Sequence, residues 1–189
     1  MGWWDSVLGR SKPAQPDLDQ LFGIPGAAVT LATAADLTPT GVGAVCFRAA
    51  EGGAFAQVSA DVQALLDADQ GPPVERVDDS YGYTWLVVRR DPDDVAGLVT
   101  DLHAVNSTLV DNGFGPALLC SLVAFGDSRG RRVGLVYLFK RGTFYPFAPQ
   151  GEPRRDSALE LQVRGLLGDD LKVEQDLSRW FPVWGAPGL

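Results

Sequence analysis

The spacing of hydrophobic positions changes several times along the chain, and each change predicts a different element. Over residues 95–109, apolar side chains recur every three or four positions, which predicts an amphipathic helix. Asp91 can cap this helix, Pro92 suits its first position, and Asn112-Gly113 can end it. This stretch carries the clearest helical pattern of the chain.

Three further stretches have the pattern of helices. A short helix is predicted over residues 18–22 and a longer amphipathic helix over residues 55–66. The last helix begins near Asp156, because Ser157 and Glu160 have the spacing of a capping box.

Runs rich in β-branched and aromatic residues predict strands between these helices. Pro25-Gly26 is interpreted as the end of the first helix, and residues 126–130 as the turn of a hairpin. Residues 83–90 are apolar on both faces, which favours a central position in a sheet. The predicted strands cover residues 28–33, 40–49, 83–90, 117–125 and 132–140.

A basic and aromatic segment, residues 140–149, follows the last predicted strand. It is predicted to be a connecting loop, stiffened by Pro146 and Pro149, that covers one end of the core or forms an interface.

The alternation of hairpins and helices predicts an α+β fold. We expect a two-layer sandwich, with a mostly antiparallel twisted sheet that carries helices chiefly on one face. Residues 17–172 would form a single domain. An amphipathic segment with a linker precedes it at residues 1–16, and an aromatic tail at 173–189 is expected to dock on it.

Composition narrows the class of protein. With 189 residues, 46% of them hydrophobic, the chain can bury one sizeable core. Its net charge of −8 disfavours binding to nucleic acid, because a surface of that sign repels phosphates. Cys46 and Cys120 lie in apolar runs and are predicted to be buried free thiols. No run is long enough to span a membrane and no signal peptide is visible, so a cytoplasmic protein is expected.

Candidate catalytic chemistry is sparse. His103, the single histidine, lies at the flank of the apolar stripe of its helix, and Asn106 lies within that stripe. No metal-binding or catalytic motif accompanies them, so we expect no metal, no cofactor and no enzymatic activity. The alternative is a small-molecule-binding protein or enzyme, with His103 and Asn106 as polar groups of a pocket between helix and sheet.

Aromatic residues are the candidates for a partner-binding surface, because tyrosine, tryptophan and phenylalanine are enriched at the centres of interfaces. Three lie in the 140–149 segment and four of the five tryptophans lie near the two ends of the chain. An alternative role for the amino-terminal pair, beside Arg10 and Lys12, is peripheral membrane binding. The candidates are Phe144, Tyr145, Phe147, Trp3, Trp4, Trp180 and Trp184.

Long collinear segments of the chain resemble the actinobacterial PspA-associated protein PspAB family, and the resemblance covers essentially the whole chain. The segments that carry it are residues 8–13, 40–49, 79–90, 101–107, 140–149 and 184–189.

This resemblance implies association with PspA, a coiled-coil protein that assembles on stressed membranes in a phage-shock type envelope-stress response. It implies no catalytic residue. We therefore expect a cytoplasmic adaptor, placed in the cytoplasm or at the inner face of the plasma membrane, that contacts a protein partner of the PspA system.

Overall fold

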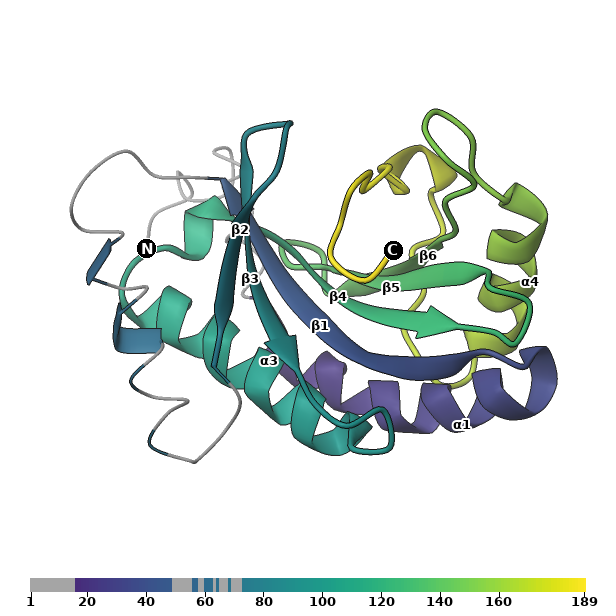
Figure 1. The fold of residues 1–189 in the computed structure, drawn as a ribbon, viewed down its shortest axis with the longest axis horizontal. Coiled ribbons are helices and arrows are strands. Elements are labelled where there is room, and N and C mark those ends of the chain that lie inside the picture. The colour runs from purple at the N-terminus through teal and green to yellow at the C-terminus, as the bar shows by residue number, and fades with distance from the viewer. Residues whose placement is uncertain (1–15, 49–55, 58–59, 63, 65–67, 69–72) are drawn as a thin grey trace, which may run out of the picture.

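The computed structural model describes residues 16–48, 56–57, 60–62, 64, 68 and 73–189. Its centre is a six-stranded sheet in the order β2-β3-β1-β4-β5-β6, and all neighbouring strands are antiparallel. This arrangement confirms the predicted α+β class (Figure 1). The strands are β1 (Thr38–Arg48), β2 (Glu75–Asp78), β3 (Tyr83–Arg89), β4 (Leu118–Gly126), β5 (Arg132–Leu138) and β6 (Thr143–Phe147).

Helices cover one face of this sheet, as expected. Figure 1 shows α1 (Ile24–Ala35) and α3 (Val95–Asp111) side by side beneath the strands, while α4 (Ser157–Leu167) packs against β6 and α1. Gly43 of β1 allows α3 to approach closely, because a Cβ atom there would lie 2.9 Å from Leu102 Cδ1. In the described part of the chain there are also three short 3-10 helices: η2 (Leu18–Gly23), η3 (Gly115–Ala117) and η4 (Leu177–Arg179).

The strand predicted at residues 28–33 is wrong, because these residues lie within α1. Pro25 occupies the first turn of α1, where its missing N–H removes no helical hydrogen bond. Pro25-Gly26 therefore lies at the beginning of a helix, whereas the sequence pattern predicts the end of the preceding helix there. The helix ends instead at Asp36, which adopts a left-handed conformation with φ of 58°.

The segment at residues 140–149 is also not a loop. Half of it, Thr143–Phe147, is the edge strand β6, which pairs with β5 and tolerates Pro146 because one of its sides has no strand partner in the sheet. All five residues of β6 are buried. The aromatic composition of this segment therefore reflects the core of the protein.

The caps of two helices differ from the predicted ones, although α4 does begin next to Asp156. Asp94, and not Asp91, caps α3, and its side chain accepts a hydrogen bond from Gly97 N. At α4, the Asp156 side chain accepts from Leu159 N, so Ser157 is the first helical residue and forms no capping box. In each case an aspartate directly before the helix provides the cap.

Two further segments are the strand β2 and the helix predicted over residues 55–66. The polar edge strand β2 was not predicted, because only one of its four residues, Val77, is apolar. Half of the residues in the helix predicted over 55–66 lie outside the described residues. Those that are described there are helical, and Val62 among them is buried.

The carboxyl-terminal tail, residues 173–189, lies across the sheet face opposite α1 and α3 (Figure 1). The Tyr145 hydroxyl donates to Phe181 O over 2.8 Å, and Trp180 Nε1 donates to Glu174 O over 3.1 Å. At its end, Gly188 lies directly against Val42 and Ala124, which belong to β1 and β4. The tail is thus the second cover of the sheet, and it has almost no regular secondary structure.

Candidate functional site

Two cavities lie on the tail-covered face of the sheet. The larger, called here the sheet–tail cavity, has a volume of about 680 Å³. Its walls come from β1, β3, β4, β5, β6 and tail residues 181–184. Most of the lining is apolar or aromatic and includes Tyr83, Trp85, Leu118, Leu138, Tyr145 and Val183. Its size and composition are those of ordinary small-molecule sites, which span about 300–1,000 Å³.

Both cysteines of the chain line this cavity. Cys46 of β1 and Cys120 of β4 are directly opposite in the antiparallel register, next to an irregularity in the pairing of the two strands. They are free and buried, as predicted. A hydrogen bond with Cys120 and burial both raise the pKa of the Cys46 thiol. The Cys46 thiol is therefore held in its neutral form, which is weakly polar and a poor nucleophile.

Asp79, the single carboxylate in the lining, is fully engaged by the protein. One oxygen accepts from the backbone N–H groups of Tyr81 and Tyr83 over 2.8 and 3.0 Å. The other accepts from Trp85 Nε1 over 2.9 Å. These three donors stabilise the carboxylate and fix the β2–β3 turn over the cavity.

Two cations, Lys140 and Arg141, also line the sheet–tail cavity, and both are exposed. Arg141 Nε donates over 2.7 Å to Glu174, which also accepts from the Thr143 hydroxyl. Within the described residues, Lys140 takes part in no ion pair. The cavity therefore combines an apolar interior with positive charge at its edge.

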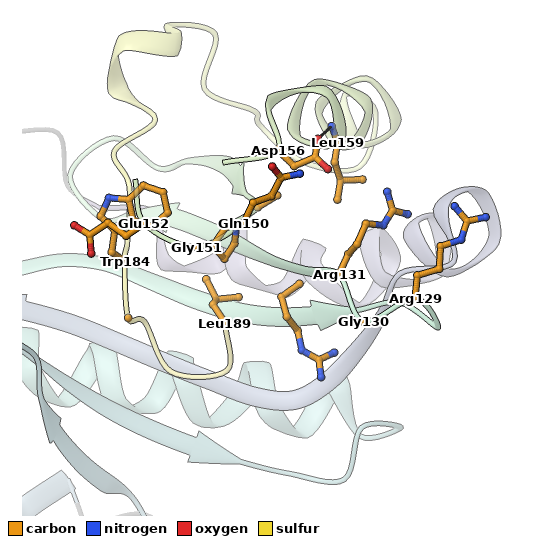
Figure 2. A pocket seen from close by; sticks show the side chains of 14 residues that line it. Arg129, Gly130, Arg131, Gln150, Gly151, Glu152, Asp156, Leu159, Trp184 and Leu189 are labelled. Atoms are coloured by element: carbon orange, nitrogen blue, oxygen red, sulfur yellow. Dashed lines mark hydrogen bonds between the residues drawn. The ribbon is translucent and has the colours of Figure 1, made fainter. Parts of the chain in front are cut away.

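The smaller cavity, about 450 Å³, lies beside the β4–β5 turn and is called here the arginine cavity. Figure 2 shows Arg129 and Arg131 on one side and Glu152 and Trp184 on the other. Arg131 is paired with Asp127 over 2.6 Å. Three arginines in its lining face two carboxylates, so this cavity has no strong excess of positive charge.

A wall separates the two cavities. Trp184 lines both of them and packs edge-on against Phe147, with ring centroids 4.9 Å apart. Tyr81 lines the larger cavity and donates a hydrogen bond of 2.5 Å to Glu152, which lines the smaller. The β2–β3 turn is thus tied to the loop before α4 across the tail.

His103 and Asn106, the predicted polar groups of a pocket between helix and sheet, line neither cavity. His103 Nε2 lies 3.3 Å from Asp19, and its ring contacts Phe22. Asn106 is fully buried, where its Nδ2 donates to Leu102 O and to the Ser121 hydroxyl, each over 2.8 Å. Asn106 therefore fixes the packing of α3 on β4.

The aromatic candidates for partner binding are placed very differently from one another. Phe144 faces the helices and contacts Tyr137, whereas Tyr145 and Phe147 face the tail. Trp180 stacks on Tyr145 and is itself buried. All three β6 aromatics are buried, so partner binding through them gains no support from their placement. Trp3 and Trp4 lie outside the described residues.

An exposed surface that the sequence analysis missed lies on η2 and α1. The twelve residues of α1 include no charged side chain, although one side of the helix faces solvent. Val29 is 66% exposed and Phe22 is 49% exposed. Surface helices ordinarily carry charged residues on this side. The strand predicted at residues 28–33 concealed the helical spacing that places Phe22, Gly26 and Val29 on one face.

No group of histidine, cysteine, aspartate or glutamate side chains in the described part of the chain is arranged to hold a metal ion. Among these same residues, no helix is both long and apolar enough to cross a membrane.

The fold is thus that of an α+β protein with one open antiparallel sheet, covered by helices on one face and by a tail with two cavities on the other. The chain belongs to the family described as PspA associated protein B, whose family model matches residues 1–188. No curated protein and no solved structure matches it.

Proposed function

We propose that this protein is a non-enzymatic accessory protein of a PspA-type membrane-stress response, and that it acts in the cytoplasm through protein contacts. The family description supports association with PspA. The observation that carries a contact role is the exposed face of α1, which has no charged side chain and which Phe22 of η2 extends; Phe22, Gly26, Val29 and Thr33 define this face.

This face suits a helical partner. Gly26 has open space where a side chain would begin, so the backbone of another helix can come close to α1 at that point. Phe22 and Val29 stand on either side of Gly26 and provide apolar area for the contact. A coiled-coil protein such as PspA would present suitable helices, and PspA is therefore the proposed direct partner.

A charged side chain in this face tests the proposal. Val29→Asp should weaken binding of the purified full-length protein to purified PspA by about tenfold or more, because a carboxylate would be desolvated at the contact. Leu177→Asp is the matched control, since Leu177 is an exposed apolar residue on η4, away from this face. Binding is measured by titration, with circular dichroism to confirm folding.

Two results would contradict the proposal in different ways. If the unsubstituted protein does not bind PspA, the direct contact is wrong. If it binds and both variants bind equally well, another surface makes the contact.

A further inference from the structure

We propose that the sheet–tail cavity binds the acyl chain of a fatty acid, whose carboxylate contacts Lys140 and Arg141. This inference concerns the face of the sheet opposite α1 and does not depend on the proposed contact with PspA.

The interior of the cavity is suited to a hydrocarbon chain. Trp85, Leu118 and Leu138 provide apolar walls, and the raised pKa of Cys46 keeps its thiol protonated. Tyr145 adds an aromatic ring whose hydroxyl is already donated to Phe181 O. Few polar groups inside the cavity lack a hydrogen-bond partner. An apolar ligand would therefore bury few unpaired polar groups, and it would avoid the free-energy cost of doing so.

The polar groups of the cavity specify the charge of the ligand. Asp79 already accepts three hydrogen bonds from the β2–β3 turn and β3, which leaves it few acceptor sites for a cationic ligand. Arg141 uses Nε for Glu174 and keeps its terminal nitrogens for a further acceptor. Together with the ammonium of Lys140, these nitrogens form the positive edge of the cavity in a chain whose net charge is −8. A carboxylate at the end of an apolar chain matches this arrangement.

The position of the tail explains how such a ligand would be enclosed. Residues 181–184 form one wall, and they are held at one end by Tyr145 and at the other by the contact of Trp184 with Phe147. Three residues of the cavity lining are exposed: Phe181, Tyr81 and Lys140. These three residues mark the side on which the cavity meets solvent.

Both cysteines lie in the cavity, so their reactivity reports directly on its occupancy. The full-length protein, freed of bound lipid, is titrated with sodium laurate while alkylation by a small maleimide is followed by mass spectrometry. Bound laurate should slow alkylation of Cys46 and Cys120 by at least about tenfold. Affinity should rise by about threefold to fourfold for each added CH2 from octanoate upwards, until the chain fills the cavity.

The head group is tested with two further amphiphiles of the same length. Dodecanol should bind more weakly than laurate, and dodecylammonium more weakly still. Lys140→Glu should weaken laurate binding by about tenfold and leave dodecanol unaffected. Lys172→Glu is the matched control, because Lys172 is an exposed lysine that lines neither cavity.

A second variant tests the location. Leu138→Trp should fill part of the cavity and abolish binding of the longer fatty acids. Absence of thiol protection by any fatty acid would overturn the proposal. So would equal affinity for laurate, dodecanol and dodecylammonium, or equal loss of laurate binding in the Lys140 and Lys172 variants. If Leu138→Trp fails to fold, the two lysine variants still test the proposal, because substitutions of these exposed side chains should leave the fold intact.

Discussion

The two faces of the sheet are covered in very different ways. On one face, α3 packs so closely that Gly43 leaves no room for a Cβ atom beneath Leu102. On the other face, an irregular tail leaves two cavities of about 680 and 450 Å³. A helix presents regular ridges of side chains to a sheet, whereas an extended tail offers only scattered anchors. The helical face therefore provides most of the close packing, and the tail face provides space for a ligand.

Hydrogen bonds from side chains of the domain hold the loosely packed tail in place. Its backbone has no regular partner strand along most of its length, so side chains satisfy its carbonyl groups. Arg155 Nη1 donates to Trp180 O over 2.8 Å, and Tyr145 donates to Phe181 O. Burial raises the pKa of Tyr145 well above its usual value, which keeps this hydroxyl protonated as a donor. Such single contacts hold the tail in place without filling the space beneath it.

The largest expected effect concerns matched leucines on the two faces. Leu102→Ala should destabilise the protein by about 3 kcal/mol, because it removes a fully buried side chain from tight packing on the helical face. Leu138→Ala should cost only about 1 kcal/mol, since Leu138 borders an existing cavity and is partly exposed. Urea unfolding monitored by circular dichroism measures both. Equal losses would show that the two faces are packed equally well.

A smaller effect is expected at the tail. Trp184→Ala removes the ring that packs on Phe147 and separates the two cavities, and it should destabilise the protein by about 2 kcal/mol. The same change should make Cys46 and Cys120 react faster with a maleimide, because the wall above them loosens. Phe22→Ala, on the helical side, is the control and should leave thiol reactivity unchanged. Unchanged reactivity in Trp184→Ala would mean that this residue does not hold the tail in place.

The smallest expected effect is a pH dependence of the stability that Glu174, at the start of the tail, contributes. Burial alone would raise the pKa of Glu174, but hydrogen bonds from Arg141, Asp176 N and Thr143 outweigh it and lower the pKa below its ordinary value of 4.5. A carboxylate with a lowered pKa contributes stability above its unfolded pKa and loses it as the pH falls through the folded value. Unfolding midpoints should therefore decrease below about pH 4.

Glu174→Gln provides the comparison for this prediction. The amide keeps a similar shape but does not titrate, so the variant should show a smaller decrease in midpoint over the same acidic range. Thermal unfolding in buffers of matched ionic strength measures the difference between the two proteins. If both lose the same stability on acidification, other carboxylates account for the acid sensitivity.

The strands that the sequence predicted correctly are those with the strongest local patterns. β3 is apolar on both faces and does lie inside the sheet, and the β4–β5 hairpin forms where its glycine-containing turn was predicted. The sheet–tail cavity could not be predicted from such local sequence patterns. Cys46 and Cys120 lie 74 positions apart, and neither shows from its own surroundings that it lies beside the other in the wall of a cavity.

Two segments show where local patterns were insufficient. Pro25-Gly26 can end one helix or begin another, and the choice depends on whether the following residues pack as a helix against α3 and α4. For the aromatic residues of β6, the sequence left open a cover of the core or an interface, because composition alone does not distinguish the two, and the structure buries these residues. In both cases the deciding contacts come from residues distant in the sequence.

The sequence by itself determined the class of fold, the main helix and most of the strands, because periodicity and caps act over a few neighbouring residues. It also carried the family membership, which rests on nearly the whole chain. The tertiary structure alone decided that the tail covers the face opposite the helices, that both thiols line one cavity, and that α1 exposes an uncharged face. Each of these depends on which side of the sheet a segment packs against, and that choice is made by contacts between parts of the chain that no local pattern connects.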